Sequence, residues 1–478
     1  MPDRYPGAVL DLLAAAGDRP VFEHGTRVVR GAELLGLVRR AASGLRAHGI
    51  GPGDGLAMML GVTPEAFAAI LAGHVVGARV VGVRPGLPEG QLRHVLDDVT
   101  AVVTDTTAPH PRPLPVAGLL TGDGPLRLAA RPDDVARLVY TSGSTGTPKA
   151  CAQTYAALDA AWTARPDAWP PAIRELASRL RRYLVFGSLA SQVMMEYGVL
   201  TLAAGGVLVV ADPPAFPDAI TRLRASASVI TVARLRALVT TQRTAPADLS
   251  SLRALMVSGS PLEPARVREA LDVLGPVVFH GYGQTETGTI SMATPFDAPG
   301  SVGVPPDVID VEVRDPAGAV VPAGVDGELY VRTPAQARGY WADPAETAAV
   351  FVDGWVRTRD LGHRDAAGRL YLTGRTRDVI IVNANLHYAG PIERVLATHP
   401  DVAEAYVVGA PSEETGEAVH AFVVPAGRTP DFAALRALVA GQLGEGCVPS
   451  AITLIDEPPL APSGKPDKRL LRVPPSTA

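Results

Sequence analysis

The first two-thirds of the chain alternates between two hydrophobic periods. The stretches 31–50 and 64–77 place apolar residues at helical spacing, and the first ends in a glycine-containing segment typical of a helix end. Short β-branched runs at 78–83, 100–105 and 205–212 predict buried strands. Helices that alternate with buried strands indicate parallel sheets covered on both faces. We therefore expect an α/β protein.

The pattern changes after about residue 300. Residues 308–332 read as antiparallel strands separated by Pro/Gly turns, which predicts a β-rich subdomain. Short strands and helices return over the last hundred residues or so, with a helix expected at 431–444 and another that starts at Pro391. We place a boundary within 375–378. The expected domains are 1–376, a large N-terminal unit, and 377–478, a small α+β unit.

Composition narrows the classes of function. The chain has 478 residues, too many for one hydrophobic core. Its net charge of −5 argues against a nucleic-acid partner. The two cysteines, Cys151 and Cys447, exclude a disulfide framework, and no Cys/His cluster has zinc-ligand spacing. The longest uncharged run, 197–211, is too short to span a bilayer. We expect a cytoplasmic enzyme.

A glycine- and hydroxyl-rich loop follows the predicted strand at 137–140. The sequence LVYTSGSTGTPKACAQTY, residues 138–155, has no bulky side chain between Thr141 and Thr147 and then places one cation, Lys149. Glycines let backbone amides approach an anion, and a lysine adds a full charge, so the loop suits a polyphosphate. Neither the Walker spacing nor the dinucleotide spacing of glycines is present. A flexible Ser/Gly linker would have a similar composition.

Two further clusters of polar residues follow strand-like runs. In FHGYGQTETG, residues 279–288, Tyr282 could stack on a base and Glu286 could hold Mg²⁺ against phosphate oxygens. Farther along, Asp360 and Arg375 could anchor a ribose, since carboxylates accept ribose hydroxyls in other nucleotide sites. A solvated turn and a surface ion pair are the plain alternatives. Lys465 lies in a Pro/Ser/Gly loop, where a lysine is usually solvated.

Taken together, these stretches resemble the superfamily of acyl-CoA synthetases, peptide-synthetase adenylation domains and luciferases. The resemblance covers about residues 50–472 and preserves the family's order and spacing. It is carried by YTSGSTGTPK, GYGQTE, GELYVR, RGYWADPAETAAVFVDGWVRTRD, GRLYLTGRTRDVIIV and PSGKPDKRLL. The resemblance implies two α/β sheet layers of parallel type and a β-rich distorted barrel in the N-terminal domain. It also implies a mobile C-terminal domain that carries a catalytic lysine.

The resemblance also implies the chemistry. ATP and a small-molecule carboxylic acid would give an acyl-adenylate and pyrophosphate, with Mg²⁺ as the metal ion. The residues that would bind the nucleotide are Thr141, Ser142, Gly143, Ser144, Thr145, Gly146, Lys149, Gly259, Ser260, His280, Gly281, Tyr282, Asp360 and Arg375. Thr285 would contact the α-phosphate, and Glu286 would bind Mg²⁺. Lys465 would bridge the carboxylate and phosphate oxygens, where a fixed cation stabilises the developing charge.

In this family the C-terminal domain rotates about a hinge, which corresponds to Arg377 here. One pose delivers Lys465, and the other brings the face at 382–390 to a thiol nucleophile, either CoA or the pantetheine of an acyl or peptidyl carrier protein. Two glycines of that face are replaced by Asn383 and Ala384. The methyl group of Ala384 narrows the thiol tunnel, so an amine or another non-thiol acceptor is the alternative.

Other departures concern the substrate and the nucleotide. Relatives have Thr-Gly-Asp where this chain has Thr358-Arg359-Asp360, so a glycine has become an arginine while the carboxylate remains. Peptide-synthetase domains carry a Phe-Asp pair where this chain has Gly187 and Ser188, which disfavours an α-amino acid as the substrate. Which acid is activated stays open. A silent scaffold protein is the remaining rival, and the joint presence of Lys465, Glu286 and Asp360 speaks against it.

Overall fold

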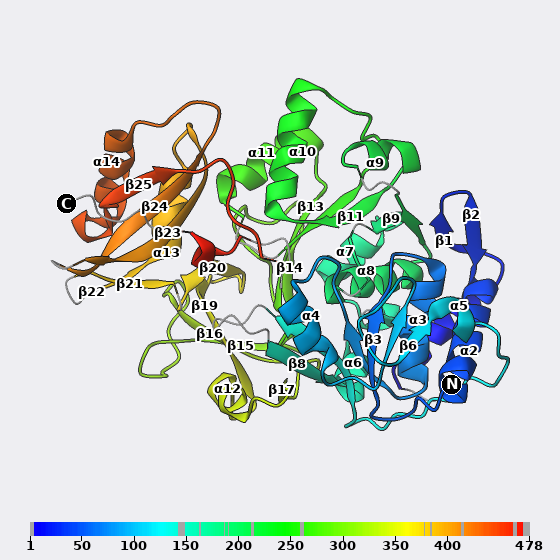
Figure 1. Cartoon of the computed structure of the whole chain (residues 1–478). Helices are drawn as coiled ribbons and strands as arrows, with labels where there is room; N and C mark the ends of the chain where they lie inside the picture. Colours follow the sequence, from blue (N-terminus) through cyan, green and yellow to red (C-terminus); the bar gives the residue numbers. More distant parts are fainter. Residues whose placement is uncertain are drawn as a thin grey trace.

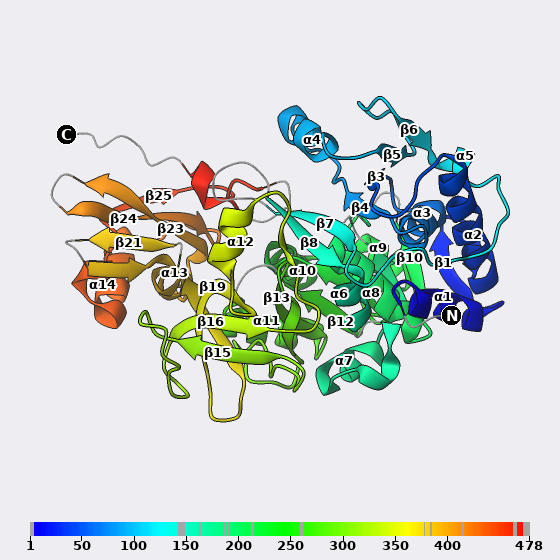
Figure 2. The ribbon, with the colours of Figure 1, turned by 90° about the horizontal axis from the view of Figure 1, so that it is seen from below.

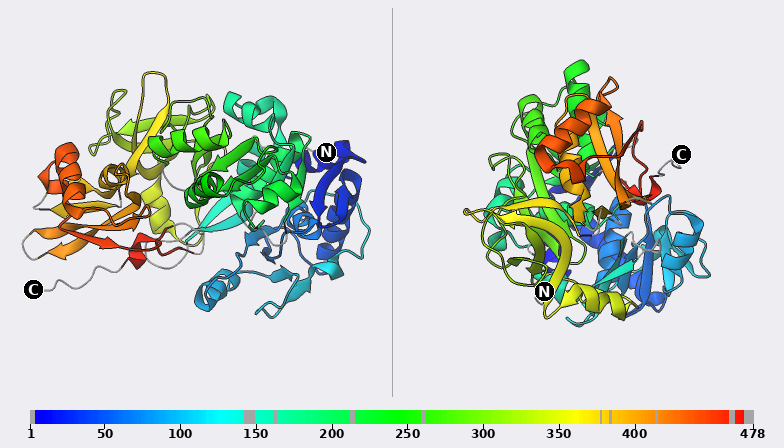
Figure 3. Two further views of the ribbon diagram at one scale, coloured as in Figure 1. Left: turned by 90° about the horizontal axis from the view of Figure 1, so that it is seen from above. Right: turned by 90° about the vertical axis from the view of Figure 1, so that its left-hand side faces the viewer.

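The computed structural model describes residues 4–141, 149–161, 164–185, 187–189, 191–211, 215–258, 262–376, 378–382, 385–412, 415–461 and 466–471. Within these residues the chain builds four sheets, two of them large and mostly parallel. Figure 1 shows the C-terminal elements at one end of the molecule and the N-terminal helices at the other. The left view in Figure 3 shows the same progression along the chain. None of the helices in this described part is long and apolar enough to cross a membrane.

The seven-stranded sheet contains the strands on either side of the predicted phosphate loop. Its strands, in spatial order, are β17 (Gly339–Tyr340), β8 (Lys149–Thr154), β7 (Val135–Thr141), β4 (Arg79–Gly82), β3 (Gly55–Met59), β5 (Ala101–Thr104) and β6 (Pro113–Pro115). The pairs from β7 to β6 are parallel, whereas β8 is antiparallel to both of its neighbours. The predicted strand before the loop is therefore β7, and residues 142–148 connect it to β8.

The eight-stranded sheet contains the second predicted cluster. Its strands, in spatial order, are β14 (Gly288–Ala293), β13 (Val278–Gln284), β12 (Ala254–Val257), β11 (Ala227–Ile230), β9 (Arg182–Val185), β10 (Val207–Val210), β1 (Pro20–His24) and β2 (Arg27–Arg30). The six central strands are parallel, and β14 and β2 close the two edges in antiparallel pairs. The turn that follows β13 therefore lies at the carboxyl ends of the parallel strands, where ligands bind in an open α/β sheet.

Helices cover both large sheets, as the hydrophobic pattern predicts. The helices of this unit are α1 (Gly7–Ala16), α2 (Gly31–Ala47), α3 (Pro64–Val75), α4 (Glu89–Leu96), α5 (Val116–Leu119), α6 (Tyr155–Ala160), α7 (Pro171–Ala177), α8 (Gln192–Ala203), α9 (Asp218–Leu223), α10 (Val232–Thr244) and α11 (Pro264–Leu274). A short 3-10 turn, η2 (Pro166–Ala168), precedes α7. Helix α3 starts as its sequence predicts, since Thr63 Oγ1 accepts the Ala66 N–H at 3.1 Å and Pro64 follows the cap.

The largest hydrophobic core lies between the two sheets. Helices α2, α3 and α8 fill it, together with the inward side chains of β3, β9 and β10. In β10, Leu208 and Val210 join this core, while Val207 and Val209 face a second core under α10 and α11. Burial of one large apolar side chain contributes about 1.5–3 kcal/mol, so this core fixes how the sheets are arranged.

The β-rich subdomain and the C-terminal unit follow in sequence. The subdomain comprises β15 (Asp310–Arg314), β16 (Gly327–Arg332), α12 (Pro344–Val350), β18 (Phe351–Val352), β19 (Trp355–Arg364) and β20 (Leu370–Arg375), all antiparallel as predicted. The C-terminal unit comprises β21 (Val379–Val382), β22 (Asn385–Tyr388), α13 (Ala389–Ala397), β23 (Val402–Ser412), β24 (Gly416–Pro425), α14 (Phe432–Leu443), η3 (Glu445–Cys447), β25 (Ala451–Leu454) and η4 (Lys468–Leu470).

One predicted helix start differs from the structure. Helix α13 begins at Ala389, two residues before Pro391, so Pro391 occupies the first turn instead of the first position. A proline lacks an N–H, and the N–H groups of the first turn have no intrahelical partner, so the position is tolerated. The helix predicted at the end of the chain is confirmed as α14, with Asp431 as its cap.

Candidate active site

Four segments of the chain meet at the site: the β7–β8 hairpin, the β13–β14 turn, the β17–α12 segment and the β19–β20 hairpin. Short contacts join them. The register places Tyr340 beside Cys151, and Asp360 beside Arg375. Figure 2 shows α12 close to the β7–β8 hairpin, with β13 behind them. The described parts of the three predicted clusters, Lys149 and the ranges 280–286 and 360–375, therefore converge in space.

Asp360 is the most tightly held carboxylate of the site. It is 4% exposed, and Oδ1 accepts the Arg375 Nε–H at 2.8 Å. Oδ2 accepts the Tyr282 hydroxyl at 2.9 Å and the Gln284 amide at 2.6 Å. A carboxylate offers about four acceptor positions, so one remains for a ligand. The Arg375 side chain is 61% exposed and can turn toward a bound ribose.

The ring of Tyr282 is more deeply buried than an aromatic ring that stacks on a base usually is. Its ring is 6% exposed and packs with Ile290 and Val302 in the core of the β-rich subdomain. Burial raises the pKa of its hydroxyl well above the ordinary value, and the charge of Asp360 raises it further. Tyr282 is therefore a neutral donor to Asp360. Its stacking on adenine stays a prediction.

The turn that carries Thr285 and Glu286 is pinned by its backbone. The Thr285 carbonyl accepts the Gln153 amide at 3.3 Å and the Cys151 thiol at 3.6 Å. The Glu286 carbonyl accepts the Ala337 N–H at 2.8 Å. These backbone contacts hold the main chain of the turn in place without using either side chain, which is the kind of pre-organisation that electrostatic catalysis needs.

Gly283 permits the close approach of the two strands at this turn. A Cβ at this position would lie 2.5 Å from the Gly288 carbonyl oxygen, which real side chains do not tolerate. The pairing of β13 with β14 shifts register at the same point. The glycine therefore lets β13 turn sharply into the loop that presents Glu286.

The surroundings of Glu286 fit a cation. Its Oε1 accepts the Tyr340 hydroxyl at 2.5 Å. Burial raises the pKa of Tyr340 above its ordinary value, and the charge of Glu286 adds to the shift. Burial raises the pKa of Cys151, and Glu286 again adds to it. Mg²⁺ is commonly held by one or two carboxylates plus substrate phosphates, so one carboxylate here suffices. No cluster of three metal-ligating side chains occurs among the described residues.

Lys149 directly follows the predicted phosphate loop in the sequence and forms ion pairs with two carboxylates. Its Nζ lies 3.1 Å from Glu346 Oε2 and 3.8 Å from Asp343 Oδ2. It also lies 5.9 Å from the centre of the Tyr340 ring. The lysine, the tyrosine and Glu286 thus form one contact chain across the site. A polyphosphate would bind next to this chain and compete with Glu346 for the lysine.

The other predicted residues divide into two groups. His280 and Gly281 lie in β13, with His280 6% exposed and Gly281 half-buried beside Tyr197. Thr141 ends β7 opposite Lys149. The remaining predictions lie outside the described residues: Ser142, Gly143, Ser144, Thr145, Gly146, Gly259, Ser260, Arg377, Asn383, Ala384 and Lys465.

Sequence reasoning missed four side chains of this neighbourhood: Gln284, Tyr340, Glu346 and Lys468. The first lies inside GYGQTE and the next two inside RGYWADPAET, so the signal was present but carried no assigned role. Asp343 Oδ1 accepts the Glu346 N–H at 3.0 Å, a helix cap that fixes where Glu346 points.

Lys468 anchors the segment that carries position 465. Its Nζ lies 2.7 Å from both Asp378 Oδ2 and Glu393 Oε1. Burial alone would lower the pKa of Lys468, but the charges of Glu393 and Asp378 outweigh burial and raise it. Asp378 directly follows the predicted hinge. The ion cluster therefore ties the segment 466–471 to the residue before β21 and to helix α13.

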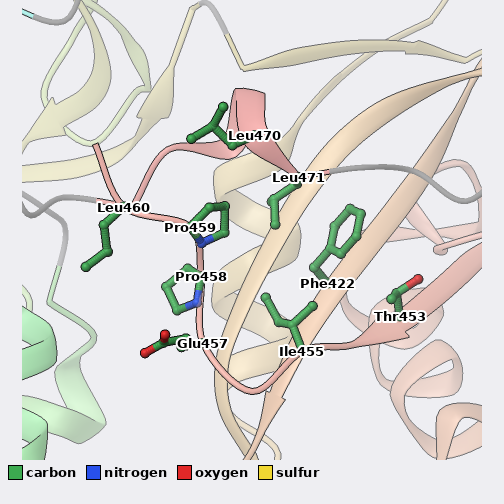
Figure 4. Close-up of a pocket in the computed structure, with 9 residues that line it drawn as sticks. All are labelled: Phe422, Thr453, Ile455, Glu457, Pro458, Pro459, Leu460, Leu470 and Leu471. Carbon is green, nitrogen blue, oxygen red and sulfur yellow. The ribbon is translucent and has the colours of Figure 1, made fainter. Parts of the chain in front are cut away.

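A shallow groove of about 600 Å³ lies on the C-terminal unit. Figure 4 shows Pro458, Pro459 and Leu460 along one segment, with Leu470 and Leu471 near Phe422 and Ile455. Leu460 and Pro466 form an isolated antiparallel bridge. The groove contains none of the predicted nucleotide-binding residues, so it is separate from the site described above.

Comparisons with known proteins identify the family. Residues 13–341 match the family described as AMP-binding enzyme, and residues 391–465 match the AMP-binding enzyme C-terminal domain. The chain is 32% identical to a feruloyl-CoA synthase of an Amycolatopsis species, over 92% of this chain and 93% of that protein. It is 32% identical to the fatty acid–[acyl-carrier-protein] ligase ScoC of Streptomyces coeruleorubidus, over 91% and 89% of the two chains.

A solved structure is similar over nearly the whole length. The amide bond synthetase McbA from Marinactinospora thermotolerans superposes with a TM-score of 0.84 and 33% identity, over 97% of this chain and 98% of that one. The chain therefore belongs to the AMP-binding enzyme family. It is an adenylate-forming enzyme and an AMP-forming ligase, so the resemblance inferred from the motifs is confirmed.

The first prediction concerns Glu286. Glu286→Gln removes the charge but keeps the shape and the contact with Tyr340. We expect the Mg²⁺ concentration for half-maximal ATP–pyrophosphate exchange to rise about tenfold or more, since the carboxylate would no longer hold the cation. An unchanged Mg²⁺ titration, in a variant with unchanged thermal unfolding, would show that Glu286 only supports the turn.

The second prediction concerns Lys468. Lys468→Met leaves Asp378 and Glu393 facing each other without a cation, and we expect the C-terminal unit to lose about 1–2 kcal/mol of stability in urea unfolding. We expect a smaller loss of stability than for a fully buried ion pair, because the side chains of Lys468, Asp378 and Glu393 are 20–34% exposed. Arg469→Met in the same turn is the matched control, since its 44%-exposed side chain pairs locally with Asp467. Equal stability of the two variants would contradict an anchoring role.

Proposed function

We propose that this protein activates a carboxylic acid with ATP and transfers the acyl group to a thiol, of CoA or of a carrier-protein pantetheine. The observation that carries the proposal is the contact chain from Lys149 through Tyr340 to Glu286. In this chain the Lys149 Nζ lies 5.9 Å from the centre of the Tyr340 ring, and the Tyr340 hydroxyl donates to Glu286, which supports a role for the lysine in binding phosphate and for the carboxylate in binding the metal ion. Asp360 and Arg375 stand next to it with a remaining acceptor position and an exposed guanidinium.

In this proposal the ribose and the phosphates of the nucleotide each have a partner. Asp360 accepts a ribose hydroxyl, and Arg375 turns from its ion pair to help hold the sugar. Lys149 leaves Glu346 for the β- and γ-phosphates. Glu286 would hold Mg²⁺, which would supply positive charge to the phosphate oxygens. A carboxylate oxygen of the acid attacks the α-phosphorus of ATP. The bond between the α-phosphorus and the oxygen that bridges to the β-phosphate breaks, and pyrophosphate leaves with the electron pair of that bond.

Lys465 supplies the remaining charge at the reacting centre. A cation about 4 Å from a developing charge contributes about 4 kcal/mol at an effective dielectric of about 20. Its delivery depends on rotation of the unit 377–478 about Arg377, with 1–376 as the fixed part. In the structure, Arg236 Nη1 donates to Glu404 Oε1 at 2.5 Å across the two units. Rotation of the C-terminal unit would break this contact.

A transfer to an amine is the second candidate. Two observations favour it: the similarity to an amide bond synthetase over 97% of this chain, and the replacement of two tunnel glycines by Asn383 and Ala384. The thiol route is supported by the similarity to a feruloyl-CoA synthase and to an acyl-carrier-protein ligase. An ATP–pyrophosphate exchange panel should include ferulic acid, indoleacetate, benzoates and fatty acids of several lengths, and its result names the acid.

The third prediction concerns Lys465. Lys465→Ala should reduce pyrophosphate exchange by about 10²-fold or more, by analogy with the loss of one pre-organised donor. Thermal unfolding should not change, because a catalytic cation is not needed for folding. The affinity for AMP, measured by calorimetry, serves as the control for an intact nucleotide site. Near-normal exchange by this variant would contradict the assignment of Lys465 as the catalytic lysine.

The fourth prediction concerns Ala384. If the acceptor is a thiol, Ala384→Gly should speed transfer from preformed adenylate to CoA by about threefold or more, since the tunnel widens by one methyl group. Pyrophosphate exchange should stay the same, because the adenylating pose does not use this face. Transfer to CoA, to a carrier protein and to simple amines would be measured in parallel. Rapid wild-type transfer to amines, with little transfer to thiols in both versions, would favour the second candidate.

A further inference from the structure

Arg359 has a backbone conformation that glycine favours. Its φ is +60°, and it lies in β19 between Thr358 and Asp360, both of which are buried. Side chains at such positions strain the backbone, whereas glycine adopts the conformation freely. The backbone has its own reason for this turn, since the Arg359 carbonyl accepts the Thr376 N–H at 2.9 Å, just before the hinge. A glycine would serve that bond equally well, so the arginine side chain needs a separate explanation.

The side chain of Arg359 reaches Glu346, the ion-pair partner of Lys149. Its Nη1 donates to Glu346 Oε1 at 2.7 Å, while Lys149 Nζ lies 3.1 Å from the other oxygen, Oε2. The three side chains are 20%, 16% and 18% exposed for Arg359, Glu346 and Lys149. One half-buried carboxylate is therefore shared by two cations, one on each oxygen.

The charge state of Glu346 depends on both cations. Burial alone would raise the pKa of its carboxyl group, but the hydrogen bonds from Arg359 and Lys149 outweigh burial and lower it. A carboxylate with so little solvent contact is unfavourable when it loses its cation. If Lys149 were the main cationic partner of Glu346, movement of the lysine to a phosphate would leave the Glu346 carboxylate without a cation, which is energetically unfavourable.

We propose that Arg359 is a positioning residue that keeps Glu346 neutralised when Lys149 turns to the β- and γ-phosphates of ATP. Arg359 itself stays on Glu346 and does not contact the nucleotide. The proposal rests on the proposed function in one respect, the binding of phosphate by Lys149. It gives the strained arginine a role that glycine at this position could not fill.

The fifth prediction follows from this role. Arg359→Gly relieves the backbone strain but leaves Glu346 to compete for Lys149, so the affinity for β,γ-methylene-ATP should fall about three- to tenfold. The affinity for AMP should not change, since AMP has no phosphate at Lys149. Both affinities would be measured by calorimetry on the full-length protein, which needs no knowledge of the acid.

Second-site rescue makes the test specific. Adding Glu346→Gln to Arg359→Gly removes the competing charge, and the affinity for β,γ-methylene-ATP should return to within about twofold of wild type. Arg224→Gly is the matched control, since Arg224 also has a positive φ, of 48°, and lies outside this cluster after α9. It should leave both affinities unchanged.

The outcomes distinguish a failure of the proposed function from a failure of the role assigned to Arg359. A wild-type protein that binds neither nucleotide would overturn the proposed function, and the inference with it. Normal wild-type binding with an unaltered Arg359→Gly affinity for the ATP analogue would overturn the role of Arg359 alone. An equal loss of affinity for the analogue and for AMP, or no rescue by Glu346→Gln, would show that Arg359 acts on Asp360 or on the nucleotide directly and would also overturn the proposal.

Discussion

The buried carboxylate of Asp360 is the interaction on which the arrangement of the site depends. It joins three parts of the fold: β13 of the eight-stranded sheet through Tyr282 and Gln284, β19 on which it lies, and β20 through Arg375. An ionised carboxylate at 4% exposure is stable only when its oxygens are satisfied. The same three donors that satisfy it also fix the strand that leads into the hinge. The candidate nucleotide site and the start of the C-terminal unit are thus positioned by one group.

Much of the fold could be predicted because its signals are local. Alternating helical and β-branched runs indicated the parallel sheets, and β10 shows the reason, with Leu208 in one core and Val209 in the other. The antiparallel β15–β16 pair was readable from its Pro/Gly turns. The start of α13 was not, because a proline in the first turn satisfies the same steric rule at more than one position.

The site was predictable to the level of motifs but not of contacts. The resemblance located Lys149, Glu286 and Asp360, which the structure brings together. It gave no role to Tyr340 or Glu346, because their function arises from the pairing of β17 with β8 and from the cap of α12. Such partners are non-local, and a sequence shows neither the register of an edge strand nor the direction of a capped side chain.

The charge balance of the site explains why a mobile lysine and a metal ion are both needed under the proposed function. The charged side chains of this site include the cations Lys149, Arg359 and Arg375 and the carboxylates Glu286, Asp343, Glu346 and Asp360. This arrangement carries no positive excess, so it keeps its side chains ordered without ATP, yet it cannot by itself neutralise a triphosphate. Mg²⁺ at Glu286 and the incoming Lys465 would supply the missing charge only when nucleotide is present. A preformed site with excess positive charge would instead bind pyrophosphate tightly after the reaction, and slow product release would then limit turnover.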